Sequence, residues 1–135
     1  MEPTSQYRVL VVDDEQSNCD FAALVLREAG YEVATASDGP AALRLTEQQR
    51  PFDLFVIDVL MPQMQGDELG RRLRKRDPDA KILYFTGYAD QLFKQRQVLW
   101  ENEAFVEKPV TLNGMLEAVS LMLFGNTQGL RRELG

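Results

Sequence analysis

Apolar runs and amphipathic segments alternate along the chain. Short apolar runs, most of them rich in β-branched or aromatic residues, predict strands. They lie at residues 7–12, 31–36, 52–59, 81–85 and 104–106. Segments with apolar residues at helical spacing predict amphipathic helices, and these lie at residues 15–29, 41–49, 67–75, 90–100 and 112–124. Because each strand is followed by a helix, the order predicts an α/β fold with a parallel sheet, right-handed crossovers and helices on both faces.

Several predicted helix boundaries carry end signals. Gly30 follows the first helix, as glycine often does at a helix C-terminus. The Ser37–Asp38 pair offers an N-cap before Pro40, a residue that the first helical turn tolerates. In the first helix we expect Phe21 on the apolar face and Cys19 on the polar face.

Length and composition fit one ordinary globular domain. The chain has 135 residues, of which 44% are hydrophobic and 27% are charged, values typical of a folded domain rather than of a disordered segment. We expect a flexible tail at residues 1–6, the domain at residues 7–124, and a second tail or the start of a linker at residues 125–135. That last segment is rich in glycine and polar residues, which is typical of such extensions.

The charge and the missing residue types exclude several kinds of chemistry. With 15 Lys and Arg against 21 Asp and Glu, the net charge is -6, which argues against nucleic acid or an anionic membrane as the main partner. The chain has no histidine and one cysteine, which excludes Ser-His-Asp and Cys-His catalysis and an internal disulfide. No apolar run is long enough to span a membrane, and residues 1–8 lack the apolar core of a signal peptide. We therefore expect a cytoplasmic protein.

Polar side chains follow the predicted strands at the points where the strands end. Asp13 and Asp14 come after the first strand, and Asp58 lies near the end of the third. Thr86 ends the fourth strand, and Lys108 follows the fifth. In an open parallel sheet, ligands bind outside the carboxyl ends of the strands. We therefore expect three carboxylates, a hydroxyl and an ammonium group to meet at one edge of the sheet.

These groups predict phosphoryl chemistry with a divalent cation. Clustered carboxylates repel one another and need a cation, and a set of oxygen ligands favours Mg²⁺ or Mn²⁺ over zinc. Lys108 and Thr86 would add a positive charge and a hydrogen-bond donor for a phosphoryl group in transfer. Asp58 is the candidate nucleophile, because it is central in the group and a carboxylate forms a covalent aspartyl phosphate.

Four segments together carry a resemblance to a known family. They are VLVVDDE at 9–15, FDLFVIDVLMPQMQG at 52–66, ILYFTGYA at 82–89 and AFVEKP at 104–109. In order, spacing and residue type they resemble the response-regulator receiver domain of two-component signalling, and the match extends over nearly the whole chain. The resemblance implies a flavodoxin-like, doubly wound fold with five parallel strands in the order 2-1-3-4-5.

The resemblance also implies a role for each residue at the candidate site. Asp58 would be the phospho-acceptor. Asp14 would bind Mg²⁺ (or Mn²⁺) directly, and Asp13 would act with it, often through water. Asp58 and the backbone carbonyl of Leu60 would complete the protein ligands of the metal, and Lys108 would pair with the phosphoryl oxygens.

Other matched positions belong to the switch and to its frame. Thr86 would turn inward to hydrogen-bond the phosphoryl group, and the aromatic ring of Phe105 would then pack inward. Gly66 matches the glycine that closes the loop after the acceptor strand, and a cis peptide is expected between Lys108 and Pro109. The face made by the fourth helix, the fifth strand and the fifth helix would act on a downstream effector or an attached output domain.

Three functions are open at this point. The first is a signalling switch, not an enzyme, that receives its phosphoryl group from a phosphohistidine of a histidine kinase or a histidine phosphotransfer protein. The donor must be a partner because the chain has no histidine. Such a switch would act as a monomer or as a phosphorylation-dependent homodimer. The second function is a phosphatase of the haloacid-dehalogenase type, which needs a second Asp where this chain has Leu60. The third is a binding module that is never phosphorylated, against which the complete set of site residues argues.

A basic cluster lies in the third predicted helix. Its members are Arg71, Arg72, Arg74, Lys75 and Arg76. The plainer interpretation is a solvated helix end, and the alternative is a contact with a partner.

Overall fold

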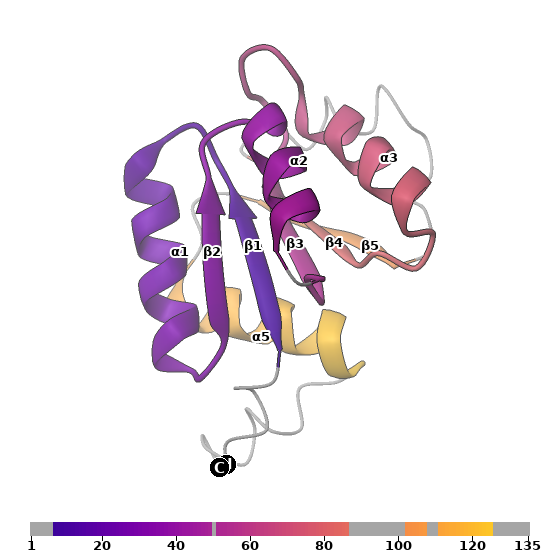
Figure 1. The fold of residues 1–135 in the computed structure, drawn as a ribbon. Coiled ribbons are helices and arrows are strands. Elements are labelled where there is room, and N and C mark those ends of the chain that lie inside the picture. Colours follow the sequence, from indigo (N-terminus) through magenta and orange to yellow (C-terminus); the bar gives the residue numbers. More distant parts are fainter. Residues whose placement is uncertain (1–6, 50, 87–101, 108–110, 126–135) are drawn as a thin grey trace.

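The computed structural model describes residues 7–49, 51–86, 102–107 and 111–125, with Thr86 described by its backbone (Figure 1). The strands are β1 (Arg8–Val12), β2 (Glu32–Ala36), β3 (Leu54–Asp58), β4 (Ile82–Thr86) and β5 (Glu103–Glu107). The helices are α1 (Gln16–Glu28), α2 (Gly39–Gln48), α3 (Gly66–Arg76) and α5 (Leu112–Phe124). These elements follow the predicted order. The helix predicted at 90–100, the tail predicted at 1–6 and all but the first residue of the tail predicted at 125–135 lie outside the described residues.

In the described part of the chain, five parallel strands form one sheet in the order β2-β1-β3-β4-β5. This order confirms the topology that the resemblance implies. β1 pairs with both β2 and β3, so Val12 lies beside Ala36 and Ile57. β3 then pairs with β4, which brings Asp58 beside Phe85. The carboxyl ends of β1 and β3 are therefore adjacent, at the edge where the sequence predicts the site.

Apolar cores lie on both faces of the sheet, because successive side chains of a strand point to opposite sides. In β1, Val9 and Val11 belong to the core with α1 and α5, whereas Leu10 and Val12 belong to the core with α2 and α3. Figure 1 shows α2 and α3 in front of the sheet and α5 behind it. A strand that is buried on both faces needs a continuous apolar run, and this explains why β1 and β3 do not alternate.

Two predicted helix boundaries have the expected cause. The Asp38 carboxylate accepts a hydrogen bond from the backbone N–H of Ala41 at 2.8 Å and so caps α2. Gly30, just after α1, has a φ of 100°, a conformation that glycine adopts without steric penalty.

Two expectations for the faces of α1 are wrong. Cys19 is buried, with 3% of its surface exposed, and Phe21 is 39% exposed. Cys19 precedes Ala22 by three residues and Leu26 by seven, which is the spacing of one helix face, and both of those residues are buried. Phe21 lies at the border of this stripe, so its ring is partly in solvent.

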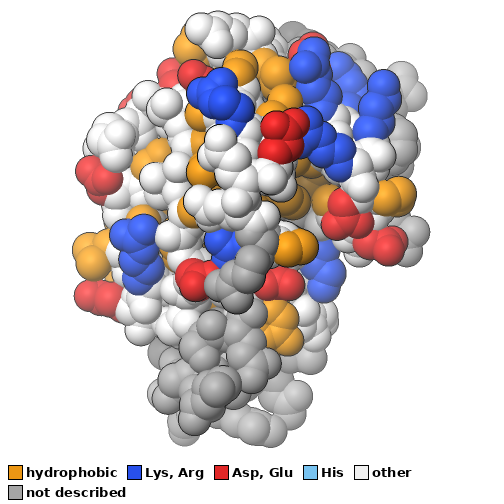
Figure 2. Space-filling view, in the orientation of Figure 1, with side chains coloured by type: hydrophobic (Ala, Val, Ile, Leu, Met, Phe, Trp, Pro, Cys, Tyr) orange, Lys and Arg blue, Asp and Glu red, His pale blue; other side chains and the backbone are white. Residues whose placement is uncertain are grey.

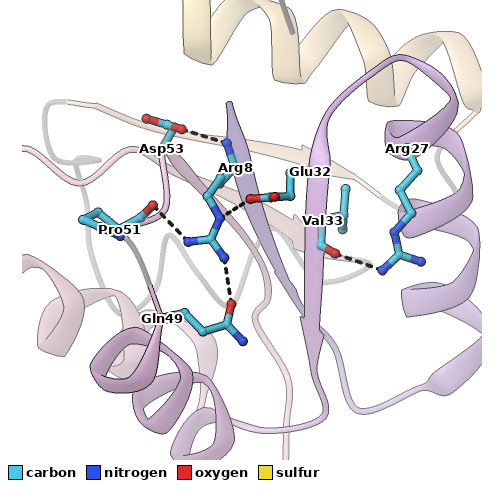
Figure 3. Close-up of polar contacts among 7 residues, drawn as sticks. All are labelled: Arg8, Arg27, Glu32, Val33, Gln49, Pro51 and Asp53. Carbon is cyan, nitrogen blue, oxygen red and sulfur yellow. Dashed lines mark hydrogen bonds and ion pairs between the residues drawn. The ribbon is translucent and has the colours of Figure 1, made fainter. Parts of the chain in front are cut away.

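Arg8 joins the amino-terminal end of the sheet to the loop before β3 (Figure 3). Its guanidinium forms an ion pair with Glu32 of β2, donates to the Gln49 side chain at 2.7 Å and donates to the Pro51 carbonyl at 3.3 Å. It also lies 4.4 Å from the ring centroid of Phe52. The Arg8 backbone N–H donates to the Asp53 carboxylate at 2.7 Å. Residues 52 and 53 therefore contact the start of β1. The strand predicted to begin at Phe52 begins at Leu54 in the structure.

The basic cluster of α3 is tied to acidic groups of the same domain. Figure 2 shows Lys and Arg side chains gathered over α3, at the upper right, with an acidic group among them. The ion pairs join Arg71 to Asp67 and Glu68, Arg72 to Glu68, Arg74 to Glu103, and Arg76 to Glu47. In the pairs of Arg71, Arg72 and Arg76 the arginine side chains are exposed, which favours the interpretation as a solvated helix end. The Arg74 side chain is 11% exposed and instead pairs inside the domain.

A buried polar network connects α3 with β4 and β5. The Glu103 side chain, which is fully buried, lies 3.4 Å from the guanidinium of Arg74 and accepts a hydrogen bond from the Tyr84 hydroxyl at 3.0 Å. Gly70 lets α3 approach β4, because a Cβ at that position would lie 2.2 Å from the Tyr84 hydroxyl oxygen.

None of the described helices is long and apolar enough to cross a membrane.

Candidate functional site

The three carboxylates expected at the strand ends lie together. Asp13 and Asp14 follow β1, and Asp58 is the last residue of β3. One ligand oxygen from each lies within 4.8 Å of the other two. Asp13 and Asp58 are buried and Asp14 is exposed. Three negative charges at this spacing need a compensating cation, and a set of hard oxygen donors with one open side fits Mg²⁺.

Hydrogen bonds hold Asp13 at its backbone and at its side chain. Its N–H donates to the Ala36 carbonyl of β2 at 3.2 Å. Its carbonyl accepts from the Cys19 thiol, with the sulfur at 3.3 Å. Its carboxylate accepts from the backbone N–H of Glu15 at 3.0 Å. The turn between β1 and α1 therefore presents the first carboxylate in a defined orientation.

Cys19 was not predicted to belong to the site, yet its thiol packs against the backbone of Asp13. Burial, together with the negative charge of Asp13, raises the pKa of Cys19 from 9.0 to about 11. The thiol is therefore protonated at neutral pH and donates its hydrogen. The spacing of Cys19 to Ala22 and Leu26 is the signal in the sequence that indicates a buried position.

Asp58 is fixed by the close approach of α3 to its backbone. A Cβ atom on Gly66 would lie 2.1 Å from the Asp58 carbonyl oxygen and 2.9 Å from a methyl carbon of Ile57, so a side chain does not fit there. The Gly66 N–H also donates to the Val59 carbonyl at 2.8 Å. The loop from Leu60 to Gln65 therefore returns directly against the end of β3.

A cavity of about 510 Å³ opens beside the carboxylates. Asp13, Glu15 and Asp58 form part of its polar wall, and the apolar side chains of Phe21 and Met115 lie in its wall as well. Among the described residues, the cavity reaches the carboxylates from the side of α1.

The other expected site residues are described to different extents. The backbone of Thr86 ends β4 and pairs with Glu107 of β5. Leu60 is partly buried after β3. Phe105 pairs with Tyr84 and packs against the core with α2 and α3. The Thr86 side chain, Lys108 and Pro109, with its expected cis peptide, lie outside the described residues.

The model of the response regulator receiver domain family matches residues 9–120. The chain belongs to this family. The receiver domain is 32% identical over 116 residues to the response regulator receiver protein CpdR of Brucella abortus, a match that covers 86% of this chain and 96% of CpdR. It is 35% identical over 116 residues to the sensor kinase CckA of the same organism, covering 85% of this chain and 12% of CckA.

A solved structure shows a similar fold. The response regulator TrrA of Thermotoga maritima, solved in complex with Mg²⁺ and BeF, has a TM-score of 0.76 and 32% identity to this receiver domain. The match covers 87% of this chain and 99% of that structure. The receiver domain is a phosphorylation-dependent signalling switch of two-component systems. Receiver domains bind Mg²⁺ at an acidic pocket and interact with histidine kinases and output domains.

Proposed function

We propose that Asp58 accepts a phosphoryl group from a phosphohistidine of a histidine kinase or a histidine phosphotransfer protein. The observation that carries this proposal is the cluster of Asp13, Asp14 and Asp58, whose ligand oxygens lie within 4.8 Å of one another at the open end of the sheet. Among the three, Asp58 ends the central strand β3 and is 7% exposed. A rigid strand end positions a nucleophile better than a loop does.

The chemical step follows from these groups. A carboxylate oxygen of Asp58 attacks the phosphorus, the bond from phosphorus to the donor nitrogen breaks, and its electron pair leaves with the imidazole of the donor. The imidazole nitrogen is protonated by solvent. Mg²⁺ at Asp13, Asp14, Asp58 and the Leu60 carbonyl would neutralise charge on the carboxylates and on the phosphoryl oxygens. The Lys108 ammonium would pair with the same phosphoryl oxygens.

We further propose that Thr86 and Phe105 read the phosphorylated state. Phosphorylation adds a charge of roughly -1.5 to -2 at Asp58, and a side chain that gains a contact in that state alone shifts the population toward it. Two features support this role. The backbone of Thr86 ends the strand next to β3, and Phe105 is partly buried, so part of its surface is still exposed to solvent. The output would pass through the face of residues 90–100, β5 and α5.

Several details of the function stay predictions. They are the identity of the phosphodonor, the downstream effector or output domain, a monomeric or homodimeric state, and a cytoplasmic location. The related proteins allow more than one arrangement, because the chain spans 96% of CpdR, 48% of the transcriptional regulatory protein PhoP of Bacillus subtilis and 12% of the sensor kinase CckA.

Incubation with acetyl phosphate, with and without Mg²⁺, tests the proposed function. We expect the intact mass to increase by one phosphoryl group when Mg²⁺ is present, and we expect no increase for Asp58→Asn. Continuous hydrolysis of phosphoesters would instead indicate the phosphatase. An unchanged mass under all conditions would indicate a binding module that is never phosphorylated.

A further inference from the structure

We propose that Cys19 is a positioning residue for Asp13, and that its thiol strengthens metal binding at the acidic cluster. The inference rests on the proposed function, because it concerns the metal that the phosphorylation step requires. Cys19 lies in the first turns of α1, is 3% exposed, and donates its thiol hydrogen to the Asp13 carbonyl across 3.3 Å.

The contact ties the acidic turn directly to α1. Between β1 and α1, the Asp13 N–H is bonded to Ala36 of β2, while the Cys19 thiol bonds the carbonyl from the side of α1. The same thiol lies 3.8 Å from the Ala36 carbonyl oxygen. β2, the acidic turn and α1 therefore meet at one sulfur atom.

The helix start gives the thiol further importance. Glu15 occupies the N-cap position of α1, but its side chain accepts no capping hydrogen bond from the first turn of the helix. The junction between the acidic turn and the helix is therefore not fixed by a side-chain cap. The backbone N–H of Cys19 bonds the Glu15 carbonyl at 3.3 Å, and the Glu15 N–H bonds the Asp13 carboxylate at 3.0 Å. The backbone of Cys19 is therefore linked to the carboxylate through Glu15, in addition to the link from its thiol to the Asp13 carbonyl.

Pre-positioning raises affinity, because a ligand that is already oriented loses less freedom when the metal binds. Loss of one neutral hydrogen bond weakens an equilibrium by about three- to fivefold. We therefore expect Cys19→Ala to raise the Mg²⁺ dissociation constant by about this factor. The Mg²⁺ concentration for half-maximal phosphorylation by acetyl phosphate should rise in parallel, while the rate at saturating Mg²⁺ stays the same.

Two variants separate positioning from loss of packing. Cys19→Ser keeps a hydrogen donor, so we expect Mg²⁺ affinity within about twofold of the wild type. Val25→Ala removes buried volume from the same helix, six residues further along and at a side chain that is 3% exposed. It should lower thermal stability and leave Mg²⁺ affinity unchanged. Isothermal titration calorimetry with MgCl₂ measures the Mg²⁺ dissociation constant of the wild type and of the three variants. Equal affinity in the wild type and in Cys19→Ala would overturn the positioning role.

A second test measures the reactivity of the Cys19 thiol in the wild-type protein. Coupling between two sites is reciprocal, so Mg²⁺ should slow alkylation of the Cys19 thiol, which is the single thiol of the chain. The control is Ala23→Cys in a Cys19→Ala background, because Ala23 is also buried in α1. We expect Mg²⁺ to slow alkylation more at position 19 than at position 23, and equal slowing would contradict the inference.

The outcomes also distinguish this inference from the function on which it rests. If the wild type binds no Mg²⁺, the proposed function and the positioning role fail together. If the wild type binds Mg²⁺ and is phosphorylated, but Cys19→Ala matches it in every readout, the positioning role fails and the proposed function stands.

Discussion

Replacement of Gly66 by alanine should disturb the phospho-acceptor more than it disturbs the fold. The new Cβ would lie 2.1 Å from the Asp58 carbonyl oxygen and 2.9 Å from the Asp58 carbonyl carbon. Backbone atoms cannot rotate away as the end of a flexible side chain does, so either β3 or the start of α3 must move. The first atoms to be displaced are those of the residue that we propose as nucleophile.

The expected loss of stability is the difference between two opposing effects. Overpacking a well-filled site costs about 1–3 kcal/mol, while replacing a helical glycine with alanine gains about 0.5–1 kcal/mol. The net loss is therefore on the order of 1–2 kcal/mol, which lowers the Tm of a domain of this size by roughly 5 °C. A shift of the reacting carboxylate by a few tenths of an ångström should slow phosphorylation by about tenfold.

Gly70→Ala is the matched control in the same helix. Its Cβ would lie 2.2 Å from the Tyr84 hydroxyl oxygen, which is bonded to buried Glu103 rather than to the acidic cluster. Both variants should lose Tm in thermal unfolding followed by circular dichroism. At a temperature well below the Tm of both variants, phosphorylation by acetyl phosphate with Mg²⁺ should be slow in Gly66→Ala and should proceed at the wild-type rate in Gly70→Ala. A wild-type rate for Gly66→Ala, or equal slowing in both variants, would refute the reasoning.

Three further predictions concern stability. Arg8→Met keeps the packing over Phe52 but removes the polar contacts of the guanidinium, and it should lower the free energy of unfolding in urea by about 1–2 kcal/mol. The control is Arg72→Met at an exposed position, which should change that free energy by less than about 0.5 kcal/mol. Equal effects of the two substitutions would contradict a stabilising role for the polar contacts of Arg8. Asp38→Ala should cost about 1 kcal/mol through the lost cap of α2, and Asp38→Asn should retain most of it, so equal losses in the two variants would argue against the cap. The pKa of Cys19 is about 11 in the folded protein and 9.0 for a free thiol. As the pH rises, the unfolded chain therefore loses this proton before the folded protein does. The free energy of unfolding should fall between pH 9 and about 11, by up to about 1.4 kcal/mol per pH unit. Cys19→Ala should flatten this slope, and an unchanged slope would show that the thiol does not cause it.

Much of the fold follows from local signals. A strand buried on both faces must be apolar throughout, and a cap such as Asp38 acts on a neighbour three residues away. Patterns of this kind lie within a few residues of each other and are therefore visible in the sequence. The acidic cluster was also predictable, because a parallel sheet brings its strand ends to one edge, and Asp13, Asp14 and Asp58 lie at the strand ends.

Contacts between distant segments were not predictable in the same way. The Arg8 guanidinium meets Gln49 and Pro51, which are 41 and 43 residues away along the chain, and no local pattern encodes that meeting. The thiol of Cys19 bonds the Asp13 carbonyl only six residues away, but this contact also depends on how α1 packs against the sheet. Such contacts depend on how the elements pack, so they become visible when the tertiary structure is known.

Mapping the modified residue tests the central claim most directly. After incubation with acetyl phosphate and Mg²⁺, borohydride reduces an aspartyl phosphate to homoserine and releases the phosphate, which leaves a stable mark for peptide mass spectrometry. We predict homoserine at position 58, dependent on both Mg²⁺ and the phosphodonor. Homoserine at another aspartate, or a phosphoryl group that is still present in Asp58→Asn, would contradict the claim that Asp58 is the phospho-acceptor.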